Sequence, residues 1–109
     1  MHDLVEIIEK KREMLNTAIT AARDRGVKYA LAKRDYDIAR TKKAFIWEQE
    51  NRKATFITNF IDGDEEIAML RWERDCCEVL YDSAKDYING VKLELRLLEA
   101  QLDREWKNS

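Results

Sequence analysis

The chain has 109 residues, no proline, three glycines and 39% charged residues. This length allows one small domain, and an apolar share of 45% is ordinary for a folded protein. The composition excludes a loop-rich or all-β chain, because strands joined by short turns need proline and glycine at close intervals. It therefore predicts an all-α chain built from long helices.

Residues 1–12 are polar and charged, so we expect no signal peptide, and no stretch approaches the ~18–20 apolar residues of a membrane span. The cysteines, Cys76 and Cys77, are adjacent, and neighbouring side chains on a helix point about 100° apart. This spacing favours two free thiols over a disulfide. We therefore expect a cytoplasmic protein without membrane contact.

Residues 3–51 are expected to form one long helix, because apolar or small residues recur every seven positions in two rows. The rows are Ile8, Leu15, Ala22, Tyr29, Tyr36 and Leu4, Ala18, Ala32, Ala39, Ile46. Lys11, Arg25 and Lys43 interrupt them. Gly26 costs about 1 kcal/mol relative to alanine inside a helix, which leaves a kink or a break open as alternatives.

Residues 52–63 are expected to connect two helices. The uncharged stretch from Ala54 to Ile61 is either a short helix or an extended connector, and Phe56, Phe60 and Ile61 are expected to cover the end of a hairpin. Asp62 is the expected N-cap of the next helix, because Glu65 follows three residues later and acidic groups suit the first turn.

Residues 64–106 have the clearest seven-residue period. The two rows are Ile67, Arg74, Tyr81, Ile88, Leu95, Leu102 and Leu70, Cys77, Ala84, Val91, Leu98, Glu105. This pattern indicates a coiled-coil seam interrupted only by Arg74 and Glu105. Further apolar residues at 76, 80, 87 and 97 widen the stripe, which favours contact with more than one neighbouring helix. Gly90 is expected to mark the close approach of another backbone.

The charges are divided along the chain. Residues 23–53 carry a net charge of +5 and residues 62–86 a net charge of −6, so folding back antiparallel would place opposite charges side by side. We therefore predict a single domain over residues 1–109, an antiparallel coiled-coil-like hairpin of two long helices. Because two helices leave much of a wide apolar stripe in water, we expect the hairpin to assemble into a helical bundle.

The sequence offers little for catalysis. His2 is the only histidine and lies at the N-terminus, where it cannot serve as an ordered base. An acidic ridge at Asp75, Glu78, Asp82 and Asp86 would either bind Mg²⁺ or form a solvated face that pairs with basic residues. The latter interpretation is favoured, and we expect no catalytic residue, metal, cofactor or small-molecule substrate, and no enzyme.

A basic block could contact phosphates, with Tyr29, Tyr36 and Trp47 as stacking groups. Its members are Arg23, Arg25, Lys28, Lys33, Arg34, Arg40, Lys42 and Lys43. The alternative is that these residues pair with the acidic block, and an overall pI near 5.5 favours it.

The predicted interface for self-association or for a partner combines the aromatic residues with the apolar stripe. It consists of Tyr29, Tyr36, Trp72, Leu80, Tyr81, Tyr87, Ile88, Leu95, Leu98 and Leu102. Trp72 lies off the seam, where it would either anchor a partner or cover the connector.

The stretches from Gly63 to Asp75, continuing to Tyr81, and from Leu93 to Trp106 resemble uncharacterised small all-helical proteins of Gram-positive phages and prophages. The resemblance implies a phage context. It leads us to expect a non-enzymatic protein that binds a larger host or phage protein, in the manner of host-defence inhibitors such as anti-CRISPR proteins. The alternatives are an accessory of phage DNA replication or recombination that binds single-stranded DNA through residues 23–53, and a purely structural homo-oligomer.

Overall fold

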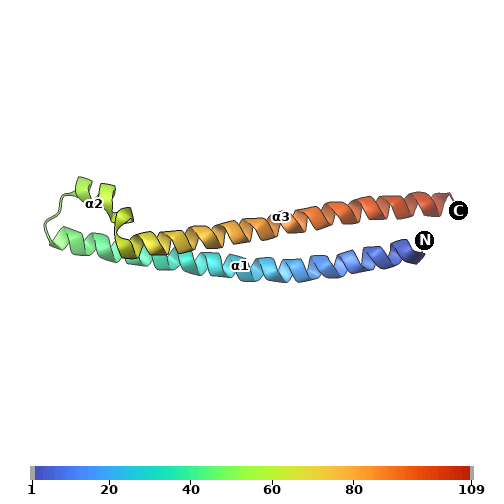
Figure 1. The fold of residues 1–109 in the computed structure, drawn as a ribbon, viewed down its shortest axis with the longest axis horizontal. Helices are drawn as coiled ribbons and strands as arrows, with labels where there is room; N and C mark the ends of the chain where they lie inside the picture. Colours follow the sequence, from blue (N-terminus) through green and yellow to red (C-terminus); the bar gives the residue numbers. More distant parts are fainter. Residues whose placement is uncertain (1, 109) are drawn as a thin grey trace. The chain divides into compact units, whose positions relative to one another are not determined.

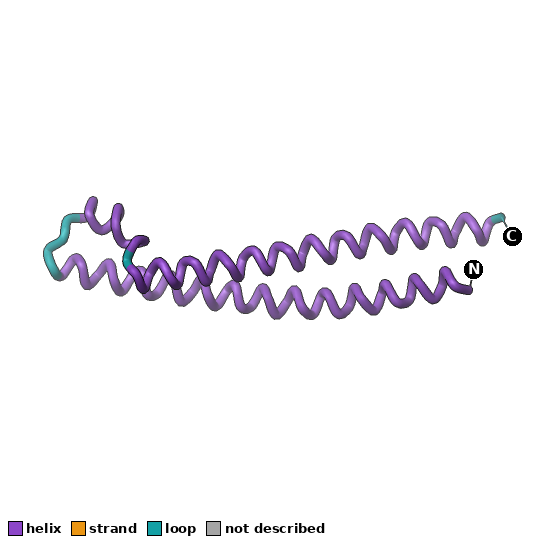
Figure 2. The backbone as a smooth tube through the Cα atoms, in the orientation of Figure 1, coloured by secondary structure: helices purple, strands orange, loops and turns teal. Residues whose placement is uncertain are grey.

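The computed structural model describes residues 2–108, and over that range the chain is helical with no strand. Helix α1 runs from His2 to Gln49, α2 from Ala54 to Phe60, and α3 from Glu65 to Lys107; a turn of 3₁₀ helix, η1, spans Ile61–Gly63 (Figures 1 and 2). Helices α1 and α3 pair antiparallel, which confirms the predicted all-α hairpin of two long helices. None of the described helices combines the length and the apolar character that crossing a membrane requires.

The contacts divide the chain into two compact units. The terminal unit joins residues 2–24 to residues 81–108, and the hairpin unit comprises residues 25–80. Each unit has its own hydrophobic cluster. That residues 1–109 form one domain stays a prediction.

The terminal unit is held by apolar side chains from both helices. Leu4 and Ile8 of α1 are buried against Val91 and Leu95 of α3, with Leu15, Leu98 and Leu102 packed around them. Two ion pairs flank this cluster: Lys11 with Glu94, and Arg12 with Glu99 at 3.1 Å between Nη2 and Oε1. Apolar burial therefore provides the attraction, and the exposed ion pairs add little to it.

The hairpin unit has its core where the connector meets the two long helices. Ile61 and Ile67 are completely buried and pack with Tyr36, which is 6% exposed. Half-buried side chains from α1, α2 and α3 surround this cluster, including Trp47 and Ile57. The connector thus contributes to the core as well as joining the helices.

The seam matches the seven-residue rows closely. Every position of the two rows on α3 is buried or half-buried, as are the positions of the rows on α1 except for Arg25 and Ile46. Lys43 interrupts the seam, yet it is only half-exposed, because its Nζ lies 3.6 Å from Asp64 and 3.2 Å from Glu66. A long aliphatic stem lets a lysine cover apolar surface while its ammonium group finds a partner at the edge.

The two glycines within the long helices have different outcomes. Helix α1 continues through Gly26, as the prediction of one long helix requires, which excludes a break at that residue. Gly90 is exposed, and a methyl group placed on it would meet nothing within 4 Å. The expectation that another backbone approaches Gly90 is therefore wrong within the described residues.

A Schellman motif ends α1. The amide of Arg52 donates to the carbonyl of Trp47 and the amide of Asn51 to that of Glu48. Asn51 has a φ of 64°, in the left-handed region that asparagine tolerates better than most residues. The Arg52 guanidinium lies 4.5 Å from the centre of the Trp47 indole, which supplies the side-chain contact that commonly accompanies this motif.

Of the two alternatives for the connector, a short helix or an extended segment, the structure shows the short helix α2. The predicted N-cap of α3 at Asp62 is wrong: α3 begins after Asp64, whose carboxylate accepts a hydrogen bond from the Ile67 amide at 3.3 Å. The reason is the 3₁₀ turn η1, which places Asp62 two residues before the cap and leaves its carboxylate for α1.

Replacing Asn51 tests the end of α1. Asn51→Ala should lower the free energy of unfolding by about 1 kcal/mol, because alanine has no local hydrogen bond to offset a left-handed conformation. Asn51→Gly should leave stability unchanged or raise it slightly. Urea unfolding followed by circular dichroism measures both, and equal stability of the two variants would contradict the motif.

Replacing Gly90 tests its open environment. Gly90→Ala should raise the free energy of unfolding by up to about 1 kcal/mol, because alanine is the better helix former and the added methyl meets no neighbour. A lower thermal midpoint of unfolding for this variant would show that another chain segment does approach Gly90.

Candidate protein-binding surface

The predicted interface residues fall into three groups. Tyr36 and Leu95 are buried; Tyr29, Tyr81, Ile88, Leu98 and Leu102 are half-buried; Trp72, Leu80 and Tyr87 are exposed. The first two groups belong to the packing between α1 and α3, because all of them lie on the seam rows. That the three exposed residues contact a partner stays a prediction.

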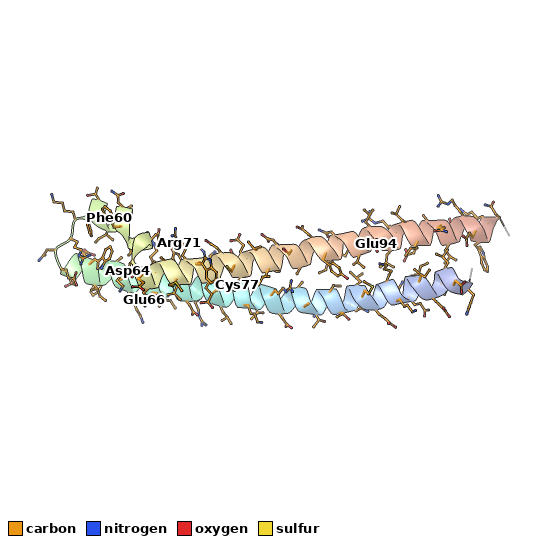
Figure 3. The ribbon with its side chains drawn as sticks, viewed as in Figure 1. Phe60, Asp64, Glu66, Arg71, Cys77 and Glu94 are labelled. Atoms are coloured by element: carbon orange, nitrogen blue, oxygen red, sulfur yellow. The ribbon has the colours of Figure 1, made fainter. Side chains whose placement is uncertain are left out.

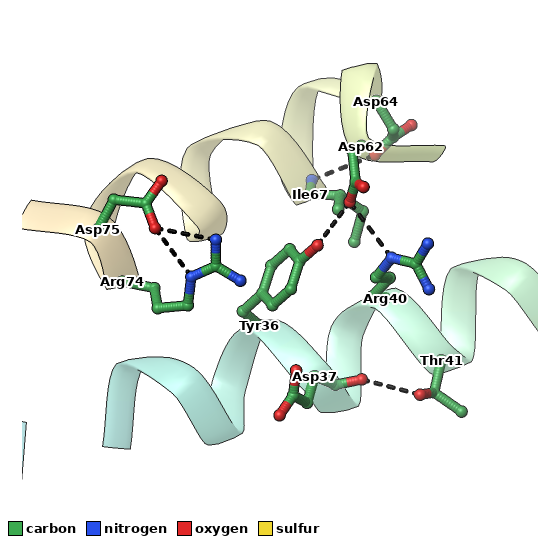
Figure 4. A network of polar contacts seen from close by, with 9 residues as sticks. All are labelled: Tyr36, Asp37, Arg40, Thr41, Asp62, Asp64, Ile67, Arg74 and Asp75. Atoms are coloured by element: carbon green, nitrogen blue, oxygen red, sulfur yellow. Dashed lines mark hydrogen bonds and ion pairs between the residues drawn. The ribbon is translucent and has the colours of Figure 1, made fainter. Parts of the chain in front are cut away.

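One carboxylate fastens the connector to α1. Asp62 Oδ1 accepts a hydrogen bond from the Tyr36 hydroxyl at 2.5 Å and one from Arg40 Nε at 3.2 Å (Figure 4). On the other side of Tyr36, the Arg74 guanidinium lies 4.4 Å from the ring centre and bonds Asp75. Tyr36 is thus held by a hydrogen bond at its hydroxyl and by a cation–π contact on its face.

Two pKa shifts reflect this arrangement. The hydrogen bond from Tyr36 holds the pKa of Asp62 below its ordinary value, with help from Arg40. Burial, together with the hydrogen bond to Asp62, raises the pKa of Tyr36. Both pKa shifts reflect the same preferred protonation states, in which the neutral Tyr36 phenol donates a hydrogen bond to the charged Asp62 carboxylate.

We call the contact of Asp62 with Tyr36 and Arg40 the anchor. Beside it lies an aromatic cluster, which we call the aromatic end, formed by Trp47, Arg52, Phe56 and Phe60. The Trp47 and Phe56 rings lie 5.8 Å apart and the Phe56 and Phe60 rings 4.8 Å apart, measured between centroids. The Arg52 guanidinium lies over Trp47 and 5.4 Å from the Phe56 ring. The cluster therefore holds its rings together without enclosing them.

The outer part of the aromatic end faces solvent. Phe60, which Figure 3 labels, is 56% exposed, Phe56 is 41% exposed, and α2 contains no buried residue. Of the three residues expected to cover the end of the hairpin, Ile61 is buried, Phe56 packs on Trp47 with much of its side chain exposed, and Phe60 is mostly exposed. The helical phase explains this: Ile57 of α2 and Ile61, which follows α2, are four residues apart on the side toward the core, while Phe56 and Phe60 are four apart on another side. The four-residue spacing within each pair can be read from the sequence, and it indicates which side of the connector faces the core and which faces solvent.

The basic block is partly engaged within the hairpin unit. Arg40 pairs with Asp62, and Lys43 with Asp64 and Glu66, as the pairing with the acidic block predicts. Arg34 instead pairs with its neighbour Asp35. Of the three expected stacking groups, Tyr36 is buried and Trp47 is covered by Arg52 and Phe56. This arrangement leaves few rings for nucleic-acid bases.

The described residues offer no assembled chemical centre. Within residues 2–108 no three His, Cys, Asp or Glu side chains are arranged to hold a metal ion. In the acidic ridge, Asp75 pairs with Arg74 and Asp82 with Lys85. Cys76 and Cys77 are free thiols, as predicted.

The anchor predicts a specific pH dependence. Tyr36→Phe should lower the free energy of unfolding by about 0.5–1.5 kcal/mol at neutral pH, because it removes one hydrogen bond. In the wild type, the lowered pKa of Asp62 contributes stability that is lost as the pH falls below about 4. The raised pKa of Tyr36 contributes stability that is lost as the pH rises above about 10.

Urea unfolding of both proteins between pH 2 and pH 11 measures these effects. Tyr36→Phe should lose less stability than the wild type at both acidic and alkaline pH, because it lacks the hydrogen bond that contributes to the pKa shifts of Asp62 and Tyr36. Parallel pH profiles for the two proteins would contradict the assigned role of the hydrogen bond.

Comparisons of this chain with protein-family models, with curated proteins and with solved structures found no match. Proposals about function therefore rest on the surface of the chain itself.

Proposed function

We propose that this chain is a non-enzymatic interaction protein that binds a larger protein through the aromatic end. The observation that carries the proposal is the exposure of Phe56 and Phe60 on a helix that buries none of its residues. Exposed large apolar groups gathered at one place commonly mark a protein-binding site. Aromatic residues and arginine are also the side chains most enriched where protein interfaces gain their affinity.

The rings and charges of the aromatic end indicate what kind of surface its partner should present. Arg52 lies over the rings and Lys53 follows it, so the rim of the cluster is basic. The matching surface is an apolar groove with acidic residues at its edge. The resemblance to phage proteins would make the partner a host or phage protein, and inhibition of host defence is the form of activity that we favour.

Protein binding is preferred to binding of single-stranded DNA for a physical reason. Stacking of bases needs open ring faces along a basic groove. In the hairpin unit Tyr36 is buried, Trp47 is covered, and Arg40 and Lys43 are in ion pairs. Nucleic-acid binding is therefore kept as an outcome of the experiment below.

The experiment compares two variants with matched exposure. Phe60→Ala should weaken binding of the partner about 10- to 100-fold, as loss of a central aromatic anchor does. Leu93→Ala should bind as the wild type does, because Leu93 lies in the terminal unit and is 53% exposed, close to the exposure of Phe60. Neither change should lower stability much, because both side chains are largely in water.

Immobilised wild type and variants are incubated with a lysate of the cells that make the protein, and bound proteins are quantified by mass spectrometry. Affinity and stoichiometry are then measured by calorimetry with the purified partner. A stoichiometric complex that Phe60→Ala weakens supports the proposal. Equal capture by all three proteins would contradict it, and capture of nucleic acid alone would favour the DNA-binding alternative.

A further inference from the structure

The hairpin unit has an exposed apolar face that we call the open face. On α1, Leu31, Ile38 and Phe45 recur every seven residues, each one position before a residue of the seam row that contains Ala32 and Ala39. On α3, Met69 and Cys76 each precede a seam residue in the same way. In an antiparallel pair, positions with the same offset from the seam lie on the same side of both helices.

The side chains of the open face are mostly in water. Leu31, Ile38, Phe45, Met69 and Leu80 are between 43% and 62% exposed. Leu80 belongs to this face because it lies between the row of Met69 and the seam. A hollow of about 340 Å³ lies at one part of the face and is lined by Ile38, Ala39 and Ile46 together with the charged residues Asp35, Lys42, Lys43 and Glu66. The face therefore presents exposed apolar side chains from both helices, with charged residues beside them.

The opposite face of the hairpin unit differs in two ways. The row on that side that corresponds to Leu31, Ile38 and Phe45 is small or acidic, with Ala30, Asp37 and Ala44 on α1 and Ala68 and Asp75 on α3. It is also where the connector packs, because Arg40 and Trp47 on that side contact Asp62 and Phe56. The connector therefore covers the polar side and leaves the open face without a cover among the described residues.

The charges at the open face indicate what covers it. Between the apolar row and the seam, α1 carries Lys28 and Lys42, with Asp35 between them, and α3 carries Glu66 and Glu73. The Asp35 carboxylate is bonded by Arg34, and Glu66 forms an ion pair with Lys43 of the same chain. The border on α1 is therefore net positive and the border on α3 net negative, which favours α1 of one copy over α3 of another.

We infer that a second copy of this chain packs on the open face as a two-fold dimer, with α1 of each copy across α3 of the other. This arrangement brings Lys42 of each copy to the level of Glu66 in the other, and Asp35, which Arg34 bonds, to the level of Glu73. It also encloses the apolar rows between the layers. The alternative rotation, with α1 across α1, would set lysines against lysines. The result is a four-helix arrangement with the two connectors at the same end, and it goes beyond the binding proposed for the aromatic end.

Sedimentation equilibrium over a wide concentration range tests the dimer. The wild type should be dimeric at micromolar concentration. Ile38→Asp should raise the dimer dissociation constant by about 30-fold or more, because it places a charge in the middle of the apolar row formed by Leu31, Ile38 and Phe45. The matched control Ala30→Asp puts the same charge on the opposite face of α1 and should leave the constant unchanged.

Circular dichroism and thermal melts of both variants establish that each is folded. A wild type that stays monomeric at the highest concentrations would overturn the inference, as would equal dissociation constants for Ile38→Asp and Ala30→Asp. Neither result bears on Phe60, so failure of the dimer and failure of the proposed function are distinguishable.

Charge exchange tests the arrangement of the helices. The double variant Lys28→Glu/Lys42→Glu should weaken the dimer, because both crossings then oppose acidic residues. Adding Glu66→Lys and Glu73→Lys to the same chain should restore it. If α1 packed across α1 instead, the wild type would oppose lysines to lysines and the double variant Lys28→Glu/Lys42→Glu would oppose glutamates to glutamates. The dissociation constant would then be unchanged in the double variant, and this result would overturn the arrangement.

Discussion

The contact of Asp62 with Tyr36 and Arg40 is the interaction on which the hairpin unit depends. A seven-residue helix and a single 3₁₀ turn have too few hydrogen bonds to hold a fixed position by themselves. Asp62 ties this segment to α1, while Ile61 beside it is completely buried with Ile67. The position of Phe56 and Phe60, and hence the geometry of the aromatic end, follows from this attachment.

The anchor also decides which side of the hairpin unit is covered. Because Arg40 and Trp47 hold the connector over the polar face, the apolar rows on the other side stay exposed. Two surfaces result, with different chemistry. The aromatic end is small, with a basic rim, and suits a different protein; the open face is long, carries both signs of charge, and suits a second copy of the chain.

The seam could be predicted because a seven-residue apolar period has few structural solutions. The N-cap of α3 could not be predicted in the same way, because the local pattern favours Asp62, which has Glu65 three residues later, over Asp64, which has Ile67 there. What separates them is a contact with Tyr36, 26 positions away, and local patterns carry no information about it. The open face was not predicted, because its residues Leu31, Ile38 and Phe45 lie beside the two seam rows, and a two-row seam pattern does not include them.

The central claim is that Asp62 holds the connector in place, and amide hydrogen exchange of Asp62→Ala tests it most directly. The Ile61 amide donates to Ile57 and the Asp64 amide to Ile61, so both report on α2 and η1. We predict that both amides exchange much faster in the variant, while the Val91 amide in the terminal unit is unchanged. Equal protection of Ile61 and Asp64 in the variant and the wild type would contradict the claim.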